Sequence, residues 1–396
     1  MKKHVVLLTI IGILLLMRPL TTSFADEWGD FTWSFQKDIL YINTITEKAV
    51  SIPNDGPWKK YYSKAKTLEL GENIRSFYDM GEMNAVTKLI IHSESAGGDM
   101  AFQNNKKLQE VVYTGENPCI YGTMFHSTRL KKITIENPDA DFIMEENILY
   151  SRDHTTLYYY FDAGNGNVVI PEGVRIINGS AFANSKIKSI QLPSSLEMIG
   201  EYAFQTCKNL KELRIPASVK HIGSGAFGGC SALTSIVFDG ESFDNNMFFD
   251  GSKLVSPDNM GYADDPWAWV YDSDGNTIGS RWIRDGSWGL FAGTGIQEIE
   301  LPICHGLQET MFYSCKNLKK VSLAEGTEIL SRAQNDMVFY QCKKLESIYI
   351  PDSVVFYDDS YRVFANIPSK CCILCHSGSN AEAYAIKYNI KYQIIP

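Results

Sequence analysis

Hydrophobic positions in the middle of the chain recur with a period of 22 or 23 residues. The period is marked by three isoleucines: Ile177, Ile199 and Ile222. Each is accompanied at fixed offsets by a proline and an Ala-Phe pair. In one unit, Leu213 and Ile215 flank the polar Arg214. This alternation predicts a short strand with two inward side chains and one outward side chain.

The rest of each unit carries its apolar positions at a different spacing. Ala203, Cys207 and Leu210 stand at i, i+4 and i+7, which predicts a short helical turn with one buried stripe. A coil of 22 or 23 residues has no core of its own and must stack on its neighbours. We therefore expect an α/β solenoid with one long parallel sheet along one side and short helical turns along the other.

Looser copies of the strand extend the array in both directions. The inward strand position recurs at Leu68, Leu89, Val111, Ile133, Val168, Ile190, Leu213, Ile236, Ile299, Val321, Ile348 and Ile373. The steps before Val168, Ile299 and Ile348 exceed the period. They predict one continuous solenoid over residues 63–396, with an extended coil at about 136–167 and an insertion at about 239–289.

The first 25 residues differ from the array. Lys2 and Lys3 precede an apolar run from Val5 to Met17, and Pro19 and the small-residue pattern of residues 23–25 follow. This order is typical of a secretory signal peptide, and about 13 apolar residues are too few to span a hydrocarbon core of about 30 Å. We expect cleavage near Ala25 and a secreted, extracellular protein that can also associate with the cell surface.

The charge balance excludes two classes of partner. The formal net charge is -9, and the predicted signal peptide holds three basic residues and no acidic one. Without it, 34 basic residues face 46 acidic ones, a net charge of -12. Nucleic acids and anionic membranes attract basic surfaces. We therefore expect no nucleic-acid partner and no membrane insertion.

The unit at residues 210–230 holds Ile-Pro, Ile-Gly, Ala-Phe and Cys landmarks that resemble those of the BspA-type leucine-rich repeat, a family of bacterial and protozoan surface proteins. Residues 26–62 resemble the family's N-terminal cap, residues 147–157 its extended coil, and residues 378–385 its C-terminal helix, within a cap at about 371–396. The resemblance implies a right-handed leucine-rich-repeat solenoid and extracellular binding, often adhesion to surfaces. It implies no catalytic residue.

The nine cysteines fall into two groups that matter for chemistry. Cys207, Cys230, Cys315 and Cys342 share one repeat position, which predicts a row of small buried side chains with mostly free thiols. The run 372–376 fits the C-x-x-C-H pattern of haem attachment and could also supply zinc ligands. It falls where the last strand is due, so we favour strand positions over a metal or cofactor site.

A second near miss lies in the insertion. The closely spaced carboxylates of Asp272 and Asp274 suggest a calcium loop, but Ile283 stands where an EF-hand needs glutamate. Asp274-Gly275 between apolar runs favours a hairpin turn instead. The sequence thus presents no metal site and no cofactor site.

The outward strand positions form the first candidate binding surface. Ile90, Val112, Thr134 and Val169 fall on consecutive coils, and we expect them to form a β-branched stripe that faces water. Arg214 and Tyr349 continue this outward row. The alternative is that β-branched residues simply suit exposed strands.

The insertion is the second candidate surface. It holds Trp267, Trp269, Trp282 and Trp288, together with Tyr271. Loops outside a repeat period can vary without breaking the stack, and binding residues concentrate on them. The stretch is faintly similar to the choline-binding repeat of cell-wall proteins. The alternative is that these aromatic side chains only close the gap left by the insertion.

We therefore expect a monomeric binding or adhesion protein that is not an enzyme. Its partner is an extracellular protein or glycan on a host or bacterial surface, bound by the sheet face, the aromatic insertion or both. Two alternatives remain open. One is a cell-wall or carbohydrate-binding module centred on the tryptophans, and the other is a hydrolase whose residues form no recognisable motif.

Overall fold

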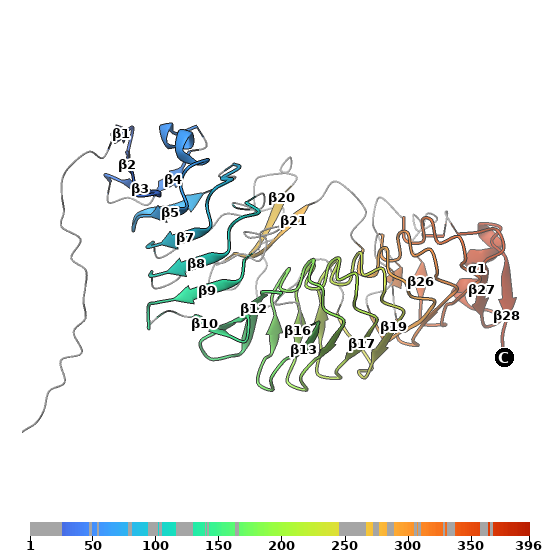
Figure 1. Cartoon of the computed structure of the whole chain (residues 1–396). Helices are drawn as coiled ribbons and strands as arrows, with labels where there is room; N and C mark the ends of the chain where they lie inside the picture. The colour runs from blue at the N-terminus through green and yellow to red at the C-terminus, as the bar shows by residue number, and fades with distance from the viewer. Residues whose placement is uncertain are drawn as a thin grey trace, which may run out of the picture.

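The computed structural model describes residues 26–396 except 47–49, 54, 78–80, 94–101, 103–104, 116–129, 139, 141, 163–165, 245–266, 272–276, 283–288, 305–306, 308–309, 328, 331–336, 357–362 and 365–366. The predicted signal peptide lies outside the described residues. Successive coils stack along the molecule with their strands side by side (Figure 1). The fold is a mostly β solenoid of stacked parallel coils with few helices.

The first stack confirms the predicted strand register. It pairs four parallel strands: β5 (Thr67–Leu70), β7 (Lys88–Ile91), β8 (Glu110–Tyr113) and β9 (Lys132–Ile135). Their inward positions stand side by side and are buried: Leu68, Leu89, Val111 and Ile133. The predicted period therefore gives the correct alignment of neighbouring coils.

The later coils repeat this arrangement. Their strands are β13 (Asn167–Val169), β15 (Ser189–Gln191), β17 (Glu212–Ile215), β19 (Ser235–Phe238), β22 (Glu298–Leu301), β23 (Lys320–Leu323), β25 (Ser347–Tyr349) and β27 (Cys372–Cys375). Val168 stands beside Ile190, and Leu213 beside Ile236. The last four inward residues, from Ile299 to Ile373, form one row.

The prediction of one long sheet is wrong. In the described part of the chain, no ladder joins β15 to β17 or β19 to β22, so the strands divide into separate sheets. Pro193 and Pro216 follow β15 and β17 and contribute no N–H group there. The long insertion leaves the stack just after β19. A repeat period places one strand in each coil, but it does not make each strand pair with the next.

A second set of short strands lies in another part of each coil. It consists of β14 (Ile176–Ile177), β16 (Met198–Ile199) and β18 (His221–Ile222) in one sheet, β24 (Ile329–Leu330) with β26 (Val355–Phe356), and β4 (Val50–Ile52) with β6 (Ile74–Phe77). The three isoleucines that mark the sequence period are buried here, in register.

The predicted helical turns are also wrong, and the fold is less α/β than expected. Around Ala203 the chain makes tight turns in which Tyr202 and Thr206 adopt left-handed backbone angles, with φ of 55° and 59°. The N–H of Phe204 donates to the carbonyl of Ala226 in the next coil at 2.8 Å. Every second backbone N–H group thus donates to a carbonyl of the next coil instead of to one within a helix. The left-handed residues orient these N–H groups toward the next coil.

Seven phenylalanines form a continuous ring stack through the core: Phe182, Phe204, Phe227, Phe291, Phe312, Phe339 and Phe364. Neighbouring centroids lie 5.1–6.0 Å apart with nearly parallel planes. The stack crosses the insertion, since Phe227 and Phe291 are 5.9 Å apart and the N–H of Phe227 donates to the carbonyl of Leu290. Coils on the two sides of the insertion are therefore direct neighbours.

An antiparallel unit separates two hydrophobic cores. It consists of β10 (Phe142–Glu145), β11 (Ile148–Ser151) and β12 (Thr156–Tyr160), lies within the segment predicted as an extended coil, and is called the β10–β12 wall below. Leu149 of β11 is buried in the N-terminal core, whereas Ile148 and Tyr150 are buried in the C-terminal core. Alternate side chains of one strand thus serve both stacks.

The two ends of the solenoid differ. At the N-terminus, β1 (Asp26–Trp28), β2 (Phe31–Gln36) and β3 (Ile39–Thr44) pair antiparallel, and β3 then pairs parallel with β5. The short 3-10 helix η1 (Pro57–Tyr61) packs Trp58 against this hairpin.

At the C-terminus, helix α1 (Asn380–Lys387) places Tyr384 on Phe356 and Phe364, and β28 (Tyr392–Ile394) pairs with β27. Ser379 begins the helix by accepting a hydrogen bond from the Glu382 N–H. None of the described helices is long and apolar enough to cross a membrane.

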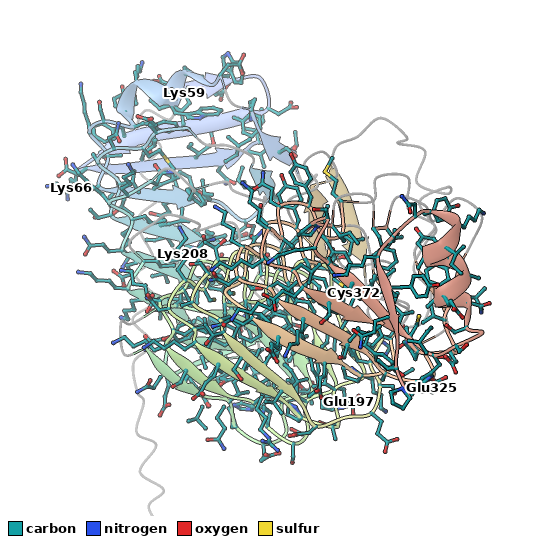
Figure 2. All side chains as sticks on the ribbon, turned by 90° about the vertical axis from the view of Figure 1, so that its right-hand side faces the viewer. Lys59, Lys66, Glu197, Lys208, Glu325 and Cys372 are labelled. Atoms are coloured by element: carbon teal, nitrogen blue, oxygen red, sulfur yellow. The ribbon has the colours of Figure 1, made fainter. Side chains whose placement is uncertain are left out.

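Several exposed charges are paired with the next coil. Lys66 binds Asp38 at 3.0 Å, and Arg175 binds Glu197 through two hydrogen bonds of 2.8 and 3.0 Å. Figure 2 shows Lys66 and Glu197 projecting from the edge of the molecule. Pairs this exposed contribute little to stability because solvent screens them, so packing rather than surface charge stabilises the stack.

The glycine of the Ile-Gly pair allows coils to approach closely. A Cβ atom on Gly223 would lie 2.5 Å from the backbone N of Glu201. We expect Gly223→Ala to lower the free energy of unfolding by about 2 kcal/mol, because backbone cannot move away as a flexible side chain can. Thermal unfolding by circular dichroism measures the loss. Ser224→Ala, at the next residue, is the control, and equal melting temperatures for the two variants would contradict the explanation.

Candidate binding groove

The predicted β-branched stripe is only partly present. Ile90, Val112 and Thr134 stand side by side in the first sheet, as expected. Val112, however, is only 5% exposed, because paired strands flank it on both sides with Ile90 and Thr134 at its level. Val169 belongs to another sheet beyond the β10–β12 wall and is 67% exposed, since β13 pairs with β15 alone among the described strands. The four residues do not form one stripe that faces water.

Arg214 is the next predicted residue on the outward row. Its guanidinium holds the carboxylate of Asp239 at two points, with Nε to Oδ2 at 2.8 Å and Nη2 to Oδ1 at 2.7 Å. This planar pair links two coils, and the arginine charge is neutralised. Arg214 stands in register with Val237, at the margin of the groove described next.

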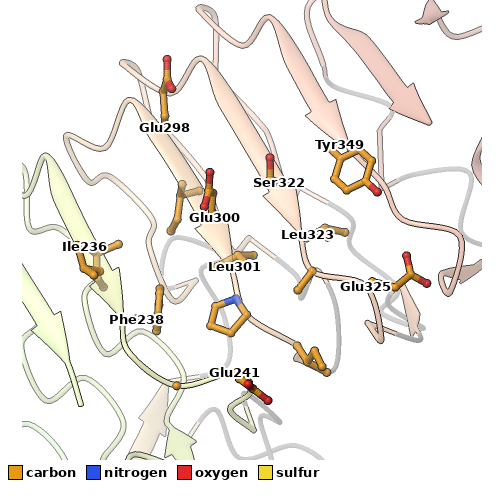
Figure 3. A pocket seen from close by; sticks show the side chains of 16 residues that line it. Ile236, Phe238, Glu241, Glu298, Glu300, Leu301, Ser322, Leu323, Glu325 and Tyr349 are labelled. Carbon is orange, nitrogen blue, oxygen red and sulfur yellow. The ribbon is translucent and has the colours of Figure 1, made fainter. Parts of the chain in front are cut away.

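A groove crosses the outward face where β19 and β22 are not joined by a ladder. Its volume is about 810 Å³, and its floor continues the predicted outward row: Val237, Glu300, Ser322 and Tyr349. One wall comes from the segments that follow the strands, including Glu241, Ile303 and Glu325. Figure 3 shows Glu300, Ser322 and Tyr349 on successive strands, with Glu241 and Glu325 below them. Of the predicted site residues, the groove contains Tyr349.

The polar lining of the groove is acidic. Glu241, Glu298, Glu300 and Glu325 line it, and no lysine, arginine or histidine does so among the described residues. Lys320 pairs with Glu298 at 3.0 Å, and the Ser353 N–H donates to Glu325 at 3.0 Å. The described ion pairs include none for the other two carboxylates. The groove therefore has a negative potential.

Tyr349 forms the far end of the groove. Its ring lies 6.2 Å from the His376 ring in an edge-to-face arrangement, and His376 Nδ1 lies 3.1 Å from Asp352 Oδ1. Partial burial raises the pKa of the Tyr349 phenol, and the nearby carboxylates of Glu325 and Asp352 raise it further. The phenol is therefore neutral at physiological pH, and its ring offers an aromatic surface to a ligand.

The aromatic insertion contains the predicted hairpin. β20 (Trp267–Tyr271) pairs antiparallel with β21 (Thr277–Trp282), and Trp267 stands opposite Trp282. Trp269 stands opposite Ser280, two positions along the ladder. Trp288 and the proposed calcium loop at 272–276 lie outside the described residues. The structure thus brings three of the four predicted tryptophans onto one short hairpin.

The repeated cysteines form hydrogen bonds between coils. The eight described cysteines are free thiols. The thiols of Cys207, Cys230, Cys315 and Cys342 each donate to a phenylalanine carbonyl of the preceding coil, at 3.0–3.1 Å. All four side chains are at most 1% exposed. A small side chain with a weak donor fits this position, because a bonded carbonyl lies directly beneath it.

The C-x-x-C-H run is strand β27. Cys375 is fully buried whereas Cys372 is half-exposed, since residues three apart in a strand lie on opposite faces. One zinc ion or one haem cannot reach both thiols. Burial raises the pKa of the Cys371 thiol to about 12 and also raises that of Cys375.

A buried carboxylate on the outward face was not predicted. Glu69 is 6% exposed, and its Oε1 lies 3.0 Å from His92 Nε2 in the next coil. His92 Nδ1 in turn lies 2.8 Å from Thr114 Oγ1. This chain crosses three coils and keeps a buried charge hydrogen-bonded. The sequence signal is weak, since His92 and Thr114 share a repeat position just after their strands but Glu69 lies within its strand.

Comparison with known proteins identifies the repeats. The family model described as BspA type leucine rich repeat region matches six copies at residues 60–151, 157–258 and 284–390. The chain belongs to the BspA-type leucine-rich repeat family. The matched ranges follow the coils seen in the structure and cover well over half of the sequence. Proteins of this BspA-type family are generally surface or interaction proteins, and no curated protein matches the chain.

Solved structures of several bacterial leucine-rich repeat proteins are similar. One is from Eubacterium ventriosum, with 18% identity, 84% of this chain and 90% of that chain covered, and a TM-score of 0.42. The pneumococcal vaccine antigen PcpA has 13% identity, coverage of 94% and 99%, and a TM-score of 0.46. A leucine rich cell surface protein from Faecalibacterium prausnitzii has 18% identity, coverage of 92% and 98%, and a TM-score of 0.32.

Thiol reactivity tests the cysteine environments. In a Cys119→Ser background, which removes the cysteine outside the described residues, we expect one thiol to react quickly with Ellman's reagent at pH 8. That thiol is Cys372, because the other described cysteines are buried. At Cys371 and Cys375, the raised pKa also keeps the thiol protonated and unreactive. Cys372→Ser should abolish the fast phase, and guanidinium should release the rest. A fast phase that survives Cys372→Ser would contradict the burial pattern.

Proposed function

We propose that this protein is a secreted or surface-attached binding protein that holds part of another macromolecule in the groove between β19 and β25. The observation that supports this most is the groove itself, about 810 Å³ of concave volume on the outward sheet face. Its lining leaves Val237 45% exposed and Ile303 37% exposed. Exposed aliphatic side chains in a concave surface are typical of binding sites.

The family and the N-terminal sequence support the same proposal. BspA-type repeat proteins are generally interaction proteins at surfaces. Residues 1–25 have the order of a signal peptide, which would deliver the groove to the outside of the cell. The proposed mechanism is complementarity of shape and charge, with no bond made or broken. The hydrogen-bonded chain of Glu69, His92 and Thr114 does not favour the hydrolase alternative. A buried carboxylate such as Glu69 needs hydrogen-bond partners whether or not the protein is an enzyme.

Filling the groove tests the proposal. Ser322 lies on the groove floor, and we expect Ser322→Trp to reduce capture of the partner at least tenfold by occupying the space that the partner needs. The measurement is a pull-down of the mature chain, residues 26–396, against extracellular-matrix proteins and bacterial wall fragments. Gln191→Trp, at an equivalent outward position outside the groove, is the matched control. Capture that survives Ser322→Trp would exclude the groove as the binding site.

The carbohydrate-binding alternative is supported by the hairpin that carries Trp267, Trp269 and Trp282. Replacing residues 245–288 with a Gly-Ser linker should leave the solenoid folded, because Phe227 and Phe291 already stack across the insertion. We expect the melting temperature to change by only a few degrees. Loss of retention on wall glycan or choline resin in this variant would favour the alternative, and unchanged retention would remove it.

A further inference from the structure

We propose that the partner of the groove is a protein segment rich in lysine or arginine, bound in an extended conformation. This inference rests on the proposed function, since it names the chemistry of what the groove holds. It is carried by two properties of one surface: the sign of its charge and the mixture of carboxylates with exposed aliphatic side chains.

The charge in the groove is not balanced by the described residues around it. Glu241 and Glu300 are exposed and have no basic partner among the described ion pairs. Arg214, the nearest basic residue on the outward row, is already held by Asp239 at two points. By contrast, Glu298, at the edge of the same groove, pairs with Lys320 of the next coil. A cationic side chain would supply the missing partner.

The apolar positions favour a polypeptide over a small polyamine. Val237 is exposed on β19, Ile303 is exposed just after β22, and the Tyr349 ring lies at the β25 end. A polyamine could pair with the carboxylates, but its unbranched chain carries no aliphatic side chain to pack on Val237 and Ile303. A peptide can place an aliphatic side chain on Val237 and a lysine or arginine beside Glu300. A second cation beside Glu325 would meet the Tyr349 ring, where a cation–π contact adds to the attraction.

The length of the groove fits a short extended segment. β22, β23 and β25 span two ladder spacings of about 4.8 Å, and the unpaired step from β19 adds at least one more, so the groove is at least roughly 14 Å long. About four extended residues cover that distance. Alternate side chains of such a segment point toward the floor, so basic residues two positions apart can reach neighbouring carboxylates.

Labelled peptides test the charge requirement directly. The probes are ten-residue peptides with serine at every second position; at the positions between, which face the same side, valine alternates with lysine, with serine or with glutamate. By fluorescence anisotropy in 50 mM NaCl, we expect the lysine peptide to bind the mature chain at least tenfold more tightly than the other two. Its binding should weaken at least tenfold in 500 mM NaCl, because salt screens exposed charges. Equal affinity for the lysine and glutamate peptides would overturn the proposal.

Matched variants locate the effect. Glu300→Gln with Glu325→Gln should weaken the lysine peptide at least tenfold. Glu212→Gln with Glu346→Gln changes the net charge equally at exposed positions outside the groove and should change affinity less than twofold. Melting curves confirm that both double variants are folded. Equal losses in the two double variants would show attraction to the whole acidic surface and would overturn the proposal.

The outcomes separate this inference from the proposed function. If Ser322→Trp abolishes capture of the macromolecular partner while the peptides show no preference for lysine, the groove is the binding site but its partner is not basic. If Ser322→Trp leaves both capture and peptide binding unchanged, the groove is not the site and both proposals fail. If Ser322→Trp abolishes capture and peptide binding, and the Glu300→Gln, Glu325→Gln variant binds the lysine peptide weakly, the proposed function and this inference are both supported.

Discussion

Every coil must fit within the spacing set by the strands of its neighbours, and this constraint determines the rest of the molecule. The phenylalanine rings repeat at 5.1–6.0 Å, close to the strand spacing, so side chain and backbone repeat together. At Gly223 a single methyl group would meet backbone. At the cysteine position a small thiol fills the space above a carbonyl. Each of the family's sequence landmarks thus corresponds to one contact between coils.

The same constraint explains what could be predicted. Leu213 and Ile299 were assigned to the inward row correctly because burial against the next coil requires an aliphatic residue there at every repeat. The turns around Tyr202 were mistaken for helix, since Ala203, Cys207 and Leu210 have helical spacing but alternate hydrogen bonds with the next coil. Burial of Val112 was missed because the alternation of a strand predicts the side on which a residue lies and not what stands beside it.

The groove could be predicted only in part. Val237, Glu300, Ser322 and Tyr349 follow from the period, because they are outward positions of successive strands. Glu241 and Ile303 lie beyond the strands, where the period does not place side chains. The volume depends on the missing ladder between β19 and β22, next to the point where the insertion leaves the stack. The insertion therefore matters to the site through the gap beside it.

The β10–β12 wall has a consequence for how the molecule meets a large partner. Leu149 and Tyr150 are neighbours in sequence, yet they are buried in different cores. Any rotation that separates the two stacks would expose apolar side chains on both faces of β11 to water. The free-energy cost of that exposure opposes bending at the β10–β12 wall. Packing on β11 thus couples the sheet of β5, β7, β8 and β9 to the later coils. When a partner contacts both parts, this coupling reduces the conformational entropy that the solenoid loses on binding.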